Sequence, residues 1–351
     1  MKRKSKSIMK CIMTFVLTLA MVLGAVPLPQ ITMVVYADSA PTYSGGSGTA
    51  EDPYKIATAD DLIALSDYSN SGYGQVFSGK YFVQTANITL TGNFTPIRMN
   101  FSGTYDGGNH IIYGLTVSGA ERAGFFAGIG QYSASGTVKN IVLYKPSVTG
   151  NSYAGAIAGS ATNSGTHIEN CCVISPTITG GGDNQGAIVG SCTNVGYSSP
   201  IKNCSVYGTD LKYNGYNDYY VSGKTTLYKL TLPEGVTATT IGDGLKGTVT
   251  IAGGTECYCI SGTEFTLTAD DSIVSGTSLK QFATTAGTLT ATDTVGTVTM
   301  TMPNNADATV TLDAVTPTIT VAEATYAGRA LTPDVTVAVN SSDLSATDDY
   351  T

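Results

Sequence analysis

A repeat of about 31 residues is the feature that most constrains how this chain folds. Three five-residue segments begin and end with glycine, and their first glycines are 31 residues apart both times. The glycine pairs are Gly124 and Gly128, Gly155 and Gly159, and Gly186 and Gly190. Each unit has room for only a few short strands, which cannot bury their own apolar side. Neighbouring units must therefore stack, and the sequence predicts a β-solenoid.

A second motif recurs in phase with the glycine pairs. It centres on Asn140, Asn170 and Asn203, which are 30 and 33 residues apart and are each followed by apolar residues. Stacking would place equivalent strands about 4.8 Å apart and align their inward side chains into a continuous core. The asparagines are predicted to form a ladder of side-chain amides at a corner, with a binding role as the alternative.

These residues carry a family resemblance. Gly186-Ala-Ile-Val-Gly190 followed by Ile201-Lys-Asn-Cys204 resembles the GLUG motif of bacterial surface proteins. The leading segments 46–62 and 101–110 are similar to those that precede such repeats. The resemblance covers roughly 45–210. It implies a right-handed parallel β-helix of adhesin-like or cell-wall proteins, or the non-catalytic part of some IgA-cleaving metallopeptidases, and it implies no particular ligand.

The start of the solenoid has its own signal. Thr58-Ala-Asp-Asp61 has the form of a capping box and is followed by spaced apolar residues, which predicts a short helix at about 59–68. Such a helix would shield the first coil from water. Segments 81–83 and 88–90 read as the first strands. We expect the solenoid domain, with this cap, to span residues 38–222.

The pattern changes after residue 222. Threonine alternates with apolar residues in short runs separated by turns, which predicts the antiparallel strands of a small sandwich over 223–315. This module resembles the β-repeats of internalin-type surface proteins. Residues 316–351 are similar to the opening half of a bacterial Ig-like repeat and supply too few strands for a sandwich. The predicted fold class is therefore all-β, and we expect either that the natural chain continues past Thr351 or that this sequence is truncated.

The first 37 residues predict export. Five basic residues precede an apolar stretch from about Ile12 to Val26, and Val35-Tyr-Ala37 suits a signal peptidase. The apolar run is short for a membrane span, so no span is expected once the leader is removed. The remaining 314 residues carry 13 basic and 26 acidic side chains. This negative balance argues against nucleic acid as a partner and suits a secreted or cell-surface protein.

The sequence shows no pattern of catalytic, cofactor or metal-binding residues. His110 and His167 stand in no metal-binding spacing and read as surface residues beside a turn and a strand. Glu169 aligns with Lys139 and Lys202, one residue per coil, which predicts a cross-strand charge ladder rather than a carboxylate pair. We therefore expect no enzymatic activity and no cofactor.

The cysteines leave one alternative open. Cys171 and Cys204 occupy equivalent positions on neighbouring coils, close enough for a disulfide. Parallel side chains favour a plain inward stack of small apolar groups instead. No zinc spacing is present among the cysteines.

A tyrosine cluster is the only local candidate for ligand contact. It comprises Tyr207, Tyr213, Tyr216, Tyr219 and Tyr220. Tyrosine suits protein or glycan contacts, but flat rings also suit a cap over the last coil. Two functions remain: an adhesin-like scaffold that contacts a host extracellular-matrix protein or glycan, or the accessory region of a larger exported peptidase or glycan-active enzyme. The oligomeric state cannot be read from the sequence.

Overall fold

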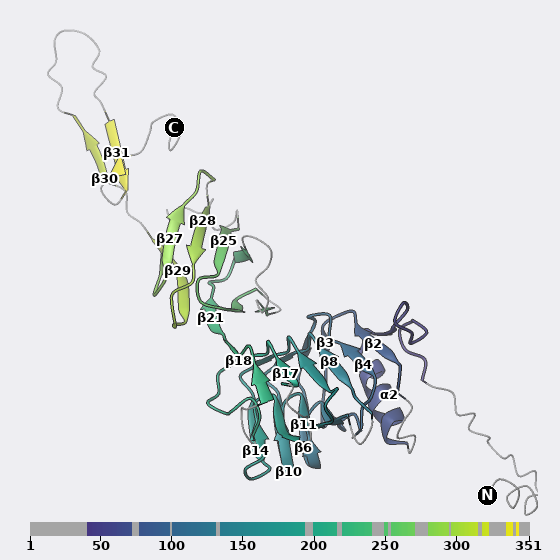
Figure 1. Ribbon diagram of the computed structural model, residues 1–351. Coiled ribbons are helices and arrows are strands. Elements are labelled where there is room, and N and C mark those ends of the chain that lie inside the picture. The colour runs from purple at the N-terminus through teal and green to yellow at the C-terminus, as the bar shows by residue number, and fades with distance from the viewer. Residues whose placement is uncertain are drawn as a thin grey trace, which may run out of the picture. The chain divides into compact units, whose positions relative to one another are not determined.

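The computed structural model divides into two compact units, residues 1–40 and 41–351. It describes residues 41–71, 77–98, 100–130, 134–193, 199–215, 220–240, 249–251, 254–270, 280–294, 296–314, 318–322, 335–339 and 342–343. The predicted leader, residues 1–37, lies outside the described residues. All elements below belong to the second unit, which is nearly all β-structure (Figure 1).

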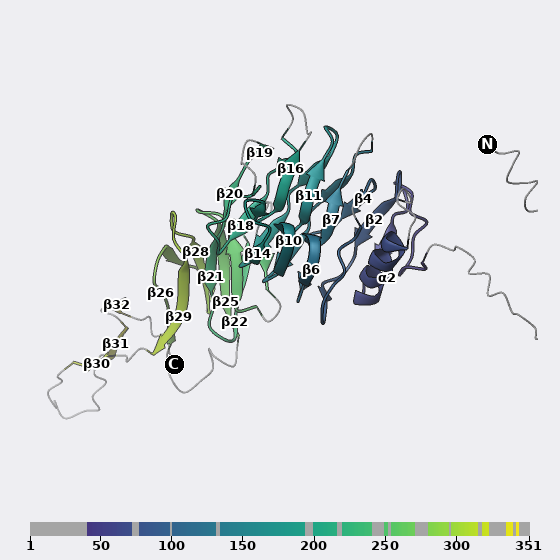
Figure 2. The same cartoon turned by 90° about the horizontal axis from the view of Figure 1, so that it is seen from below.

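The described helix, α2 (Ala59–Asn70), begins at the predicted capping box. The Thr58 hydroxyl accepts a hydrogen bond from the Asp61 amide at 3.1 Å, and the Asp61 carboxylate accepts one from the Thr58 amide at 3.0 Å. Leu62 and Leu65 are fully buried and belong to the same core cluster as Phe82 of the first coils. The helix lies at one end of the stacked strands (Figure 2), where the sequence predicted a cap.

Parallel strands stack in four sheets that together form the solenoid. The first sheet has the order β1 (Tyr54–Ile56), β2 (Tyr81–Gln84), β4 (Thr104–Asp106), β8 (Thr137–Lys139), β12 (His167–Glu169), β17 (Ile201–Lys202) and β19 (Val221–Ser222). The second sheet has the order β3 (Ile88–Thr89), β5 (Ile111–Tyr113), β9 (Val142–Tyr144), β13 (Cys172–Ile174), β18 (Ser205–Tyr207) and β20 (Thr225–Thr226).

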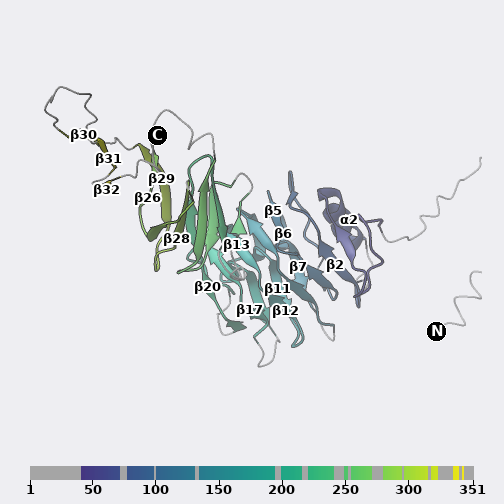
Figure 3. The ribbon, with the colours of Figure 1, turned by 90° about the horizontal axis from the view of Figure 1, so that it is seen from above.

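Two further sheets complete each coil. The third contains β6 (Thr116–Ala123), β10 (Ser147–Gly155), β14 (Thr177–Gly180) and β15 (Gln185–Gly186). The fourth contains β7 (Phe126–Ile129), β11 (Ala158–Thr162) and β16 (Val189–Thr193). Strands of successive coils lie side by side (Figure 3), and their pairing is parallel throughout. The predicted solenoid is confirmed.

Aligned inward side chains fill the solenoid. In the first sheet they form one column, each at most 1% exposed: Phe82, Tyr105, Val138, Ile168 and Ile201. In the second sheet the equivalent column is Ile88, Ile112, Leu143, Val173 and Val206. Burial of these side chains stabilises the fold by roughly 25 cal/mol for each Å² of apolar surface removed from water. One coil alone could not bury these side chains, because the neighbouring coils cover them.

The repeated asparagines and glycines are needed at their positions for different structural reasons. Asn140, Asn170 and Asn203 have φ of 55°, 54° and 52°, so each turns the corner between the first and second sheets in the left-handed conformation that asparagine tolerates. Gly155, by contrast, does not have a positive φ. A Cβ there would lie 2.5 Å from the backbone nitrogen of Gly190 and would also overlap the carbonyl oxygen of Ala158. This glycine is therefore required by the close approach of backbone segments in neighbouring coils.

The pairing between successive coils departs from the 31-residue spacing at β11. Gly155 pairs with Gly186, and Ala158 with Val189, as the 31-residue spacing predicts. On the other side, however, Ala158 pairs with Phe126, one residue out of step with the glycine pairs. Along β10 and β6 the register shifts by one residue and returns to the 31-residue spacing at Ala154, which pairs with Ala123, so the extra residue lies between Ala154 and Ala158.

The module after the solenoid is a two-sheet sandwich with its own core. One sheet has the order β23 (Val249–Thr250), β24 (Glu256–Cys259), β21 (Tyr228–Thr231), β29 (Ala308–Ala314) and β26 (Lys280–Thr284). The other has the order β22 (Val236–Thr240), β25 (Glu264–Ala269), β28 (Thr297–Thr301) and β27 (Thr288–Ala291). The pairing is antiparallel as predicted, except that β21 and β29 run parallel.

The last described strands form a separate small sheet. It consists of β30 (Thr318–Val321), β31 (Val335–Val339) and β32 (Ser342–Asp343), paired in antiparallel fashion. The sequence predicted the opening part of an Ig-like repeat here. No helix in the described residues is long and apolar enough to cross a membrane.

Candidate functional site

A column of outward side chains runs along the first sheet, at the corner where the asparagines lie. The strand register places seven positions in line: Lys55, Val83, Asp106, Lys139, Glu169, Lys202 and Ser222. We call this set the polar column. Because alternate residues of a strand point to opposite faces, the neighbours of these residues fill the core while the column faces solvent. Its side chains are half-buried or exposed.

Charges of opposite sign follow one another along the polar column. The Lys139 ammonium lies 3.2 Å from an Asp106 carboxylate oxygen, and the Lys202 ammonium lies 3.9 Å from Glu169. Nδ1 of His167 is 3.4 Å from the same Glu169. The side chains of these ion pairs are between 27% and 39% exposed, so each pair contributes at most about 1 kcal/mol. The predicted Lys-Glu-Lys alignment is present in the strand register, and the Lys139 ammonium pairs with Asp106.

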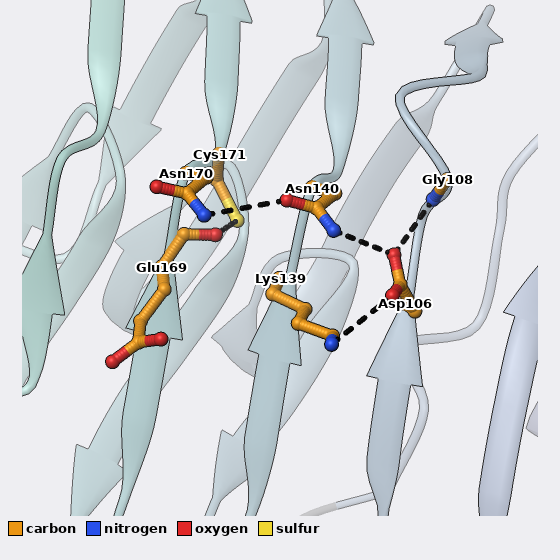
Figure 4. A network of polar contacts seen from close by, with 7 residues as sticks. All are labelled: Asp106, Gly108, Lys139, Asn140, Glu169, Asn170 and Cys171. Carbon is orange, nitrogen blue, oxygen red and sulfur yellow. Dashed lines mark hydrogen bonds and ion pairs between the residues drawn. The ribbon is translucent and has the colours of Figure 1, made fainter. Parts of the chain in front are cut away.

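A hydrogen-bonded amide ladder accompanies the charges (Figure 4). The Asn170 side-chain amide donates to Oδ1 of Asn140 at 3.4 Å, and the Asn140 amide donates to Oδ1 of Asp106 at 2.8 Å. Oδ1 of Asp106 also accepts from the Gly108 amide at 2.9 Å. The two asparagines therefore stack as predicted. Asp106 ends the ladder, because it accepts hydrogen bonds from the two amides and forms an ion pair with Lys139.

The sequence missed the place of Asp106 in the column. Sequence alignment by the asparagine motif starts the charge ladder at Lys139, but the register pairs Asp106 directly with Lys139. Two carboxylates, Asp106 and Glu169, therefore do share the column, with Lys139 between them, contrary to the expectation that no two carboxylates occupy equivalent positions. Among the described residues no cluster of three or more histidine, cysteine or acidic side chains is arranged to hold a metal ion.

The two histidines lie where the sequence placed them. His110 closes the turn after β4, where its amide donates to the Gly107 carbonyl at 2.9 Å, and its side chain is half-buried. His167 begins β12 beside Glu169. The two belong to different coils and do not form a joint site.

The described tyrosines of the cluster, Tyr207, Tyr213 and Tyr220, lie in two different places. The Tyr213 hydroxyl donates to the Thr225 carbonyl at 2.8 Å, and Tyr213 and Tyr220 pack against the solenoid core. Burial raises the pKa of Tyr213 to about 12. Tyr207 instead points toward the sandwich module, while Tyr216 and Tyr219 lie outside the described residues. Tyr213 and Tyr220 thus help to cover the last coils, and a ligand-contact role for the cluster stays a prediction.

The outer face of the second sheet is apolar and is covered by the sandwich module. We call this contact the seam. Its buried members from the solenoid are Ile111, Val142, Cys172 and Ile174, and those from the module and the residue leading into it are Leu227, Val249, Ile251 and Tyr258. Tyr113, Tyr144 and Tyr207 pack at its margin. A solenoid sheet with one face in water would carry polar residues there, so these apolar residues require the cover.

Two carboxylates of the module accept hydrogen bonds from solenoid tyrosines across the seam. The Tyr144 hydroxyl donates to Oε2 of Glu256 at 3.0 Å, and the Tyr207 hydroxyl donates to Oδ2 of Asp307 at 2.6 Å. Glu256 also accepts from Tyr258 at 2.9 Å and lies 3.9 Å from the Lys229 ammonium. These contacts join residues about 100 positions apart in the chain.

The seam changes the acidity of its members. Burial of Glu256 opposes its charged form, but hydrogen bonds from Tyr258 and Tyr144, with the charges of Lys229 and Lys145, outweigh burial and lower its pKa. Burial and the bond to Asp307 raise the pKa of Tyr207. Both changes favour the observed arrangement, in which neutral tyrosines donate to an ionised carboxylate.

The described cysteines are free and buried. Cys171 and Cys204 are fully buried and point inward, and neither is in a disulfide, so the plain inward stack is the arrangement observed. Burial, followed by the neighbouring Cys204 thiol, raises the pKa of Cys171. Cys172 faces the opposite way, into the seam, as the alternation along the strand requires.

Comparison with known proteins gives local similarities. No protein-family model matches the chain. A segment is 33% identical over 110 residues to halomucin of Haloquadratum walsbyi, which covers 27% of this chain and 1% of halomucin. The chain is also similar to the crystal structure of a proposed immunoglobulin A1 protease from Bacteroides ovatus. That match has 22% sequence identity and a TM-score of 0.36, and it covers 48% of this chain and 60% of the other. The chain thus spans less than two thirds of either protein.

Proposed function

We propose that this chain is an exported, non-catalytic scaffold of the adhesin-like type, which presents the polar column of its solenoid to a matrix protein or a glycan. The observation that carries the proposal is the column itself. Four successive coils of it carry alternating charges, Asp106, Lys139, Glu169 and Lys202, and a filled core holds them in register. Complementary charges give orientation and selectivity in a contact more than raw affinity.

The arrangement of the carboxylates supports a binding role over a catalytic one. Glycoside hydrolysis needs two carboxyl groups that face one substrate with space for water or sugar between them. In the polar column Lys139 occupies the position between Asp106 and Glu169, and it is ion-paired with Asp106. The leader sequence at residues 1–37 supports export. The similarity to halomucin covers only 1% of that protein and therefore defines no role for this chain.

The test is a binding screen of the mature chain, residues 38–351, against a glycan array and a panel of matrix proteins. A double variant, Lys139→Glu with Lys202→Glu, reverses both cations of the polar column. The matched control is Lys280→Glu, because Lys280 is an exposed lysine at the start of β26 in the module. We expect the wild type and the control to retain a shared ligand that the double variant loses. Capture of nothing, or equal capture by all three, would refute a role for the column.

A further inference from the structure

The seam joins the solenoid and the module through few polar contacts and one compact apolar cluster. Glu256 is its best-connected polar group. It receives Tyr144 from β9, Tyr258 from its own strand and the Lys229 ammonium from β21, with Lys145 close to Tyr144. Tyr207 of β18 makes the second tie, to Asp307, whose other oxygen accepts the Lys229 amide at 2.7 Å.

We propose that the seam is a latch: ionised Glu256 holds the sandwich module closed over the second sheet, and protonation of Glu256 releases the module and uncovers the apolar face with Cys172 at its centre. The geometry supports this because Glu256 bridges the two parts, whereas the apolar members of the seam give no preference for pH. Both parts also have complete cores of their own, so each can stay folded when the seam opens.

The direction of the pH effect follows from the contacts. Hydrogen bonds and lysine charges stabilise the ionised carboxylate in the closed form and lower the pKa of Glu256 below the ordinary glutamate value. The closed form is therefore favoured above that ordinary value, near 4.5, and loses this advantage as the pH falls through the lowered pKa. The titratable groups that face Glu256 are Tyr144, Tyr258, Tyr207, Lys229 and Lys145.

Cys172 provides a reporter already present in the chain. Its side chain is 3% exposed beneath the module, and burial raises its pKa to about 12. The other described cysteines belong to the two cores: Cys171, Cys192 and Cys204 in the solenoid, and Cys257 and Cys259 in the module. Opening of the seam alone would expose Cys172, and global unfolding would expose all six together.

The experiment measures the modification of each thiol by a pyridyl disulfide between pH 7 and pH 3, using the mature chain and peptide mass spectrometry. Each rate is divided by the rate in unfolded protein at the same pH. In the wild type we expect the Cys172 rate to rise below about pH 4.5 while the core thiols stay protected. Glu256→Gln should raise the Cys172 rate at pH 7 about tenfold or more and flatten its pH profile, because a hydrogen bond to a charged group is lost.

Two further variants separate the latch from general destabilisation. Tyr144→Phe keeps the Glu256 charge but removes the bond across the seam, so it should also expose Cys172 at pH 7. Glu264→Gln removes an exposed carboxylate from β25 of the same module, outside the seam, and should behave as the wild type. The latch is overturned if Glu256→Gln leaves Cys172 as protected as in the wild type at every pH. It is equally overturned if the core thiols react together with Cys172.

Discussion

Replacement of Gly155 by alanine tests whether the repeated glycines are required by packing. At an ordinary position this change stabilises a protein by about 0.4–1 kcal/mol, because it restricts the unfolded chain. The φ of Gly155 is not in the left-handed region, so the backbone itself would accept alanine. The added methyl group would, however, lie 2.5 Å from the Gly190 nitrogen and against the Ala158 carbonyl. Both are backbone atoms of buried strands, which cannot rotate away as a side chain would.

We therefore expect Gly155→Ala to destabilise the solenoid by about 3 kcal/mol, the upper part of the range for overpacked cores. The control is Gly119→Ala. Gly119 has a positive φ of 78° but open space where an added Cβ would lie, so strain alone should cost about 1 kcal/mol. Guanidinium unfolding followed by circular dichroism measures both free energies. A neutral or stabilising Gly155→Ala, or a smaller loss than for Gly119→Ala, would refute the packing account.

Two further predictions concern the core and the cap. Ile168→Ala removes a fully buried side chain between Val138 and Ile201 and should cost about 2–5 kcal/mol, against about 0.5–1.5 kcal/mol for Ile168→Val; equal losses in urea unfolding would contradict a tightly filled column. Burial opposes the charge of Asp61, but hydrogen bonds from Ser44, Ala57 and Thr58 outweigh burial and lower its pKa. The ionised Asp61 carboxylate therefore stabilises the folded state at pH values above its unfolded pKa of about 3.9. This stabilisation is lost as the pH falls through the lowered pKa of the folded state. Asp61→Asn should reduce stability at pH 7 and weaken the loss between pH 5 and pH 3, and parallel acid profiles for variant and wild type would contradict this.

Local signals in the sequence predicted much of the solenoid. The capping box fixed the start of α2 because its two hydrogen bonds involve residues only three apart. The asparagines marked the corners because a left-handed turn admits few residue types. The glycine spacing gave the length of a coil because close backbone approach recurs once per coil.

Contacts between distant residues could not be predicted in the same way. Asp106 was missed because its coil turns the corner through Gly107, Gly108 and Asn109, where the later coils use one asparagine. The seam was missed because Tyr144 and Glu256 are 112 residues apart and nothing in either local pattern indicates the other. Alternating threonines predicted antiparallel strands but not which strands lie side by side, so the parallel pair β21 and β29 was unexpected.

The seam also changes how the chain should be divided. The sequence suggested a solenoid domain that ends at residue 222 and a separate sandwich module over 223–315. The structure instead places module residues over an apolar solenoid face. A fragment that ends at residue 222 would expose this face to water, and its nonspecific binding would be difficult to distinguish from ligand capture. Binding measurements are therefore better made with residues 38–351, which include the module.

Methyl–methyl nuclear Overhauser effects in the deuterated mature chain test the stacked parallel solenoid most directly. The register places Val138 beside Ile168, Leu143 beside Val173, and Val148 beside Ile178. Each pair lies one coil apart, with neighbouring strands about 4.8 Å from each other. The structure predicts a cross-peak for all three pairs. Their absence, or cross-peaks that match antiparallel order between the same segments, would contradict the solenoid.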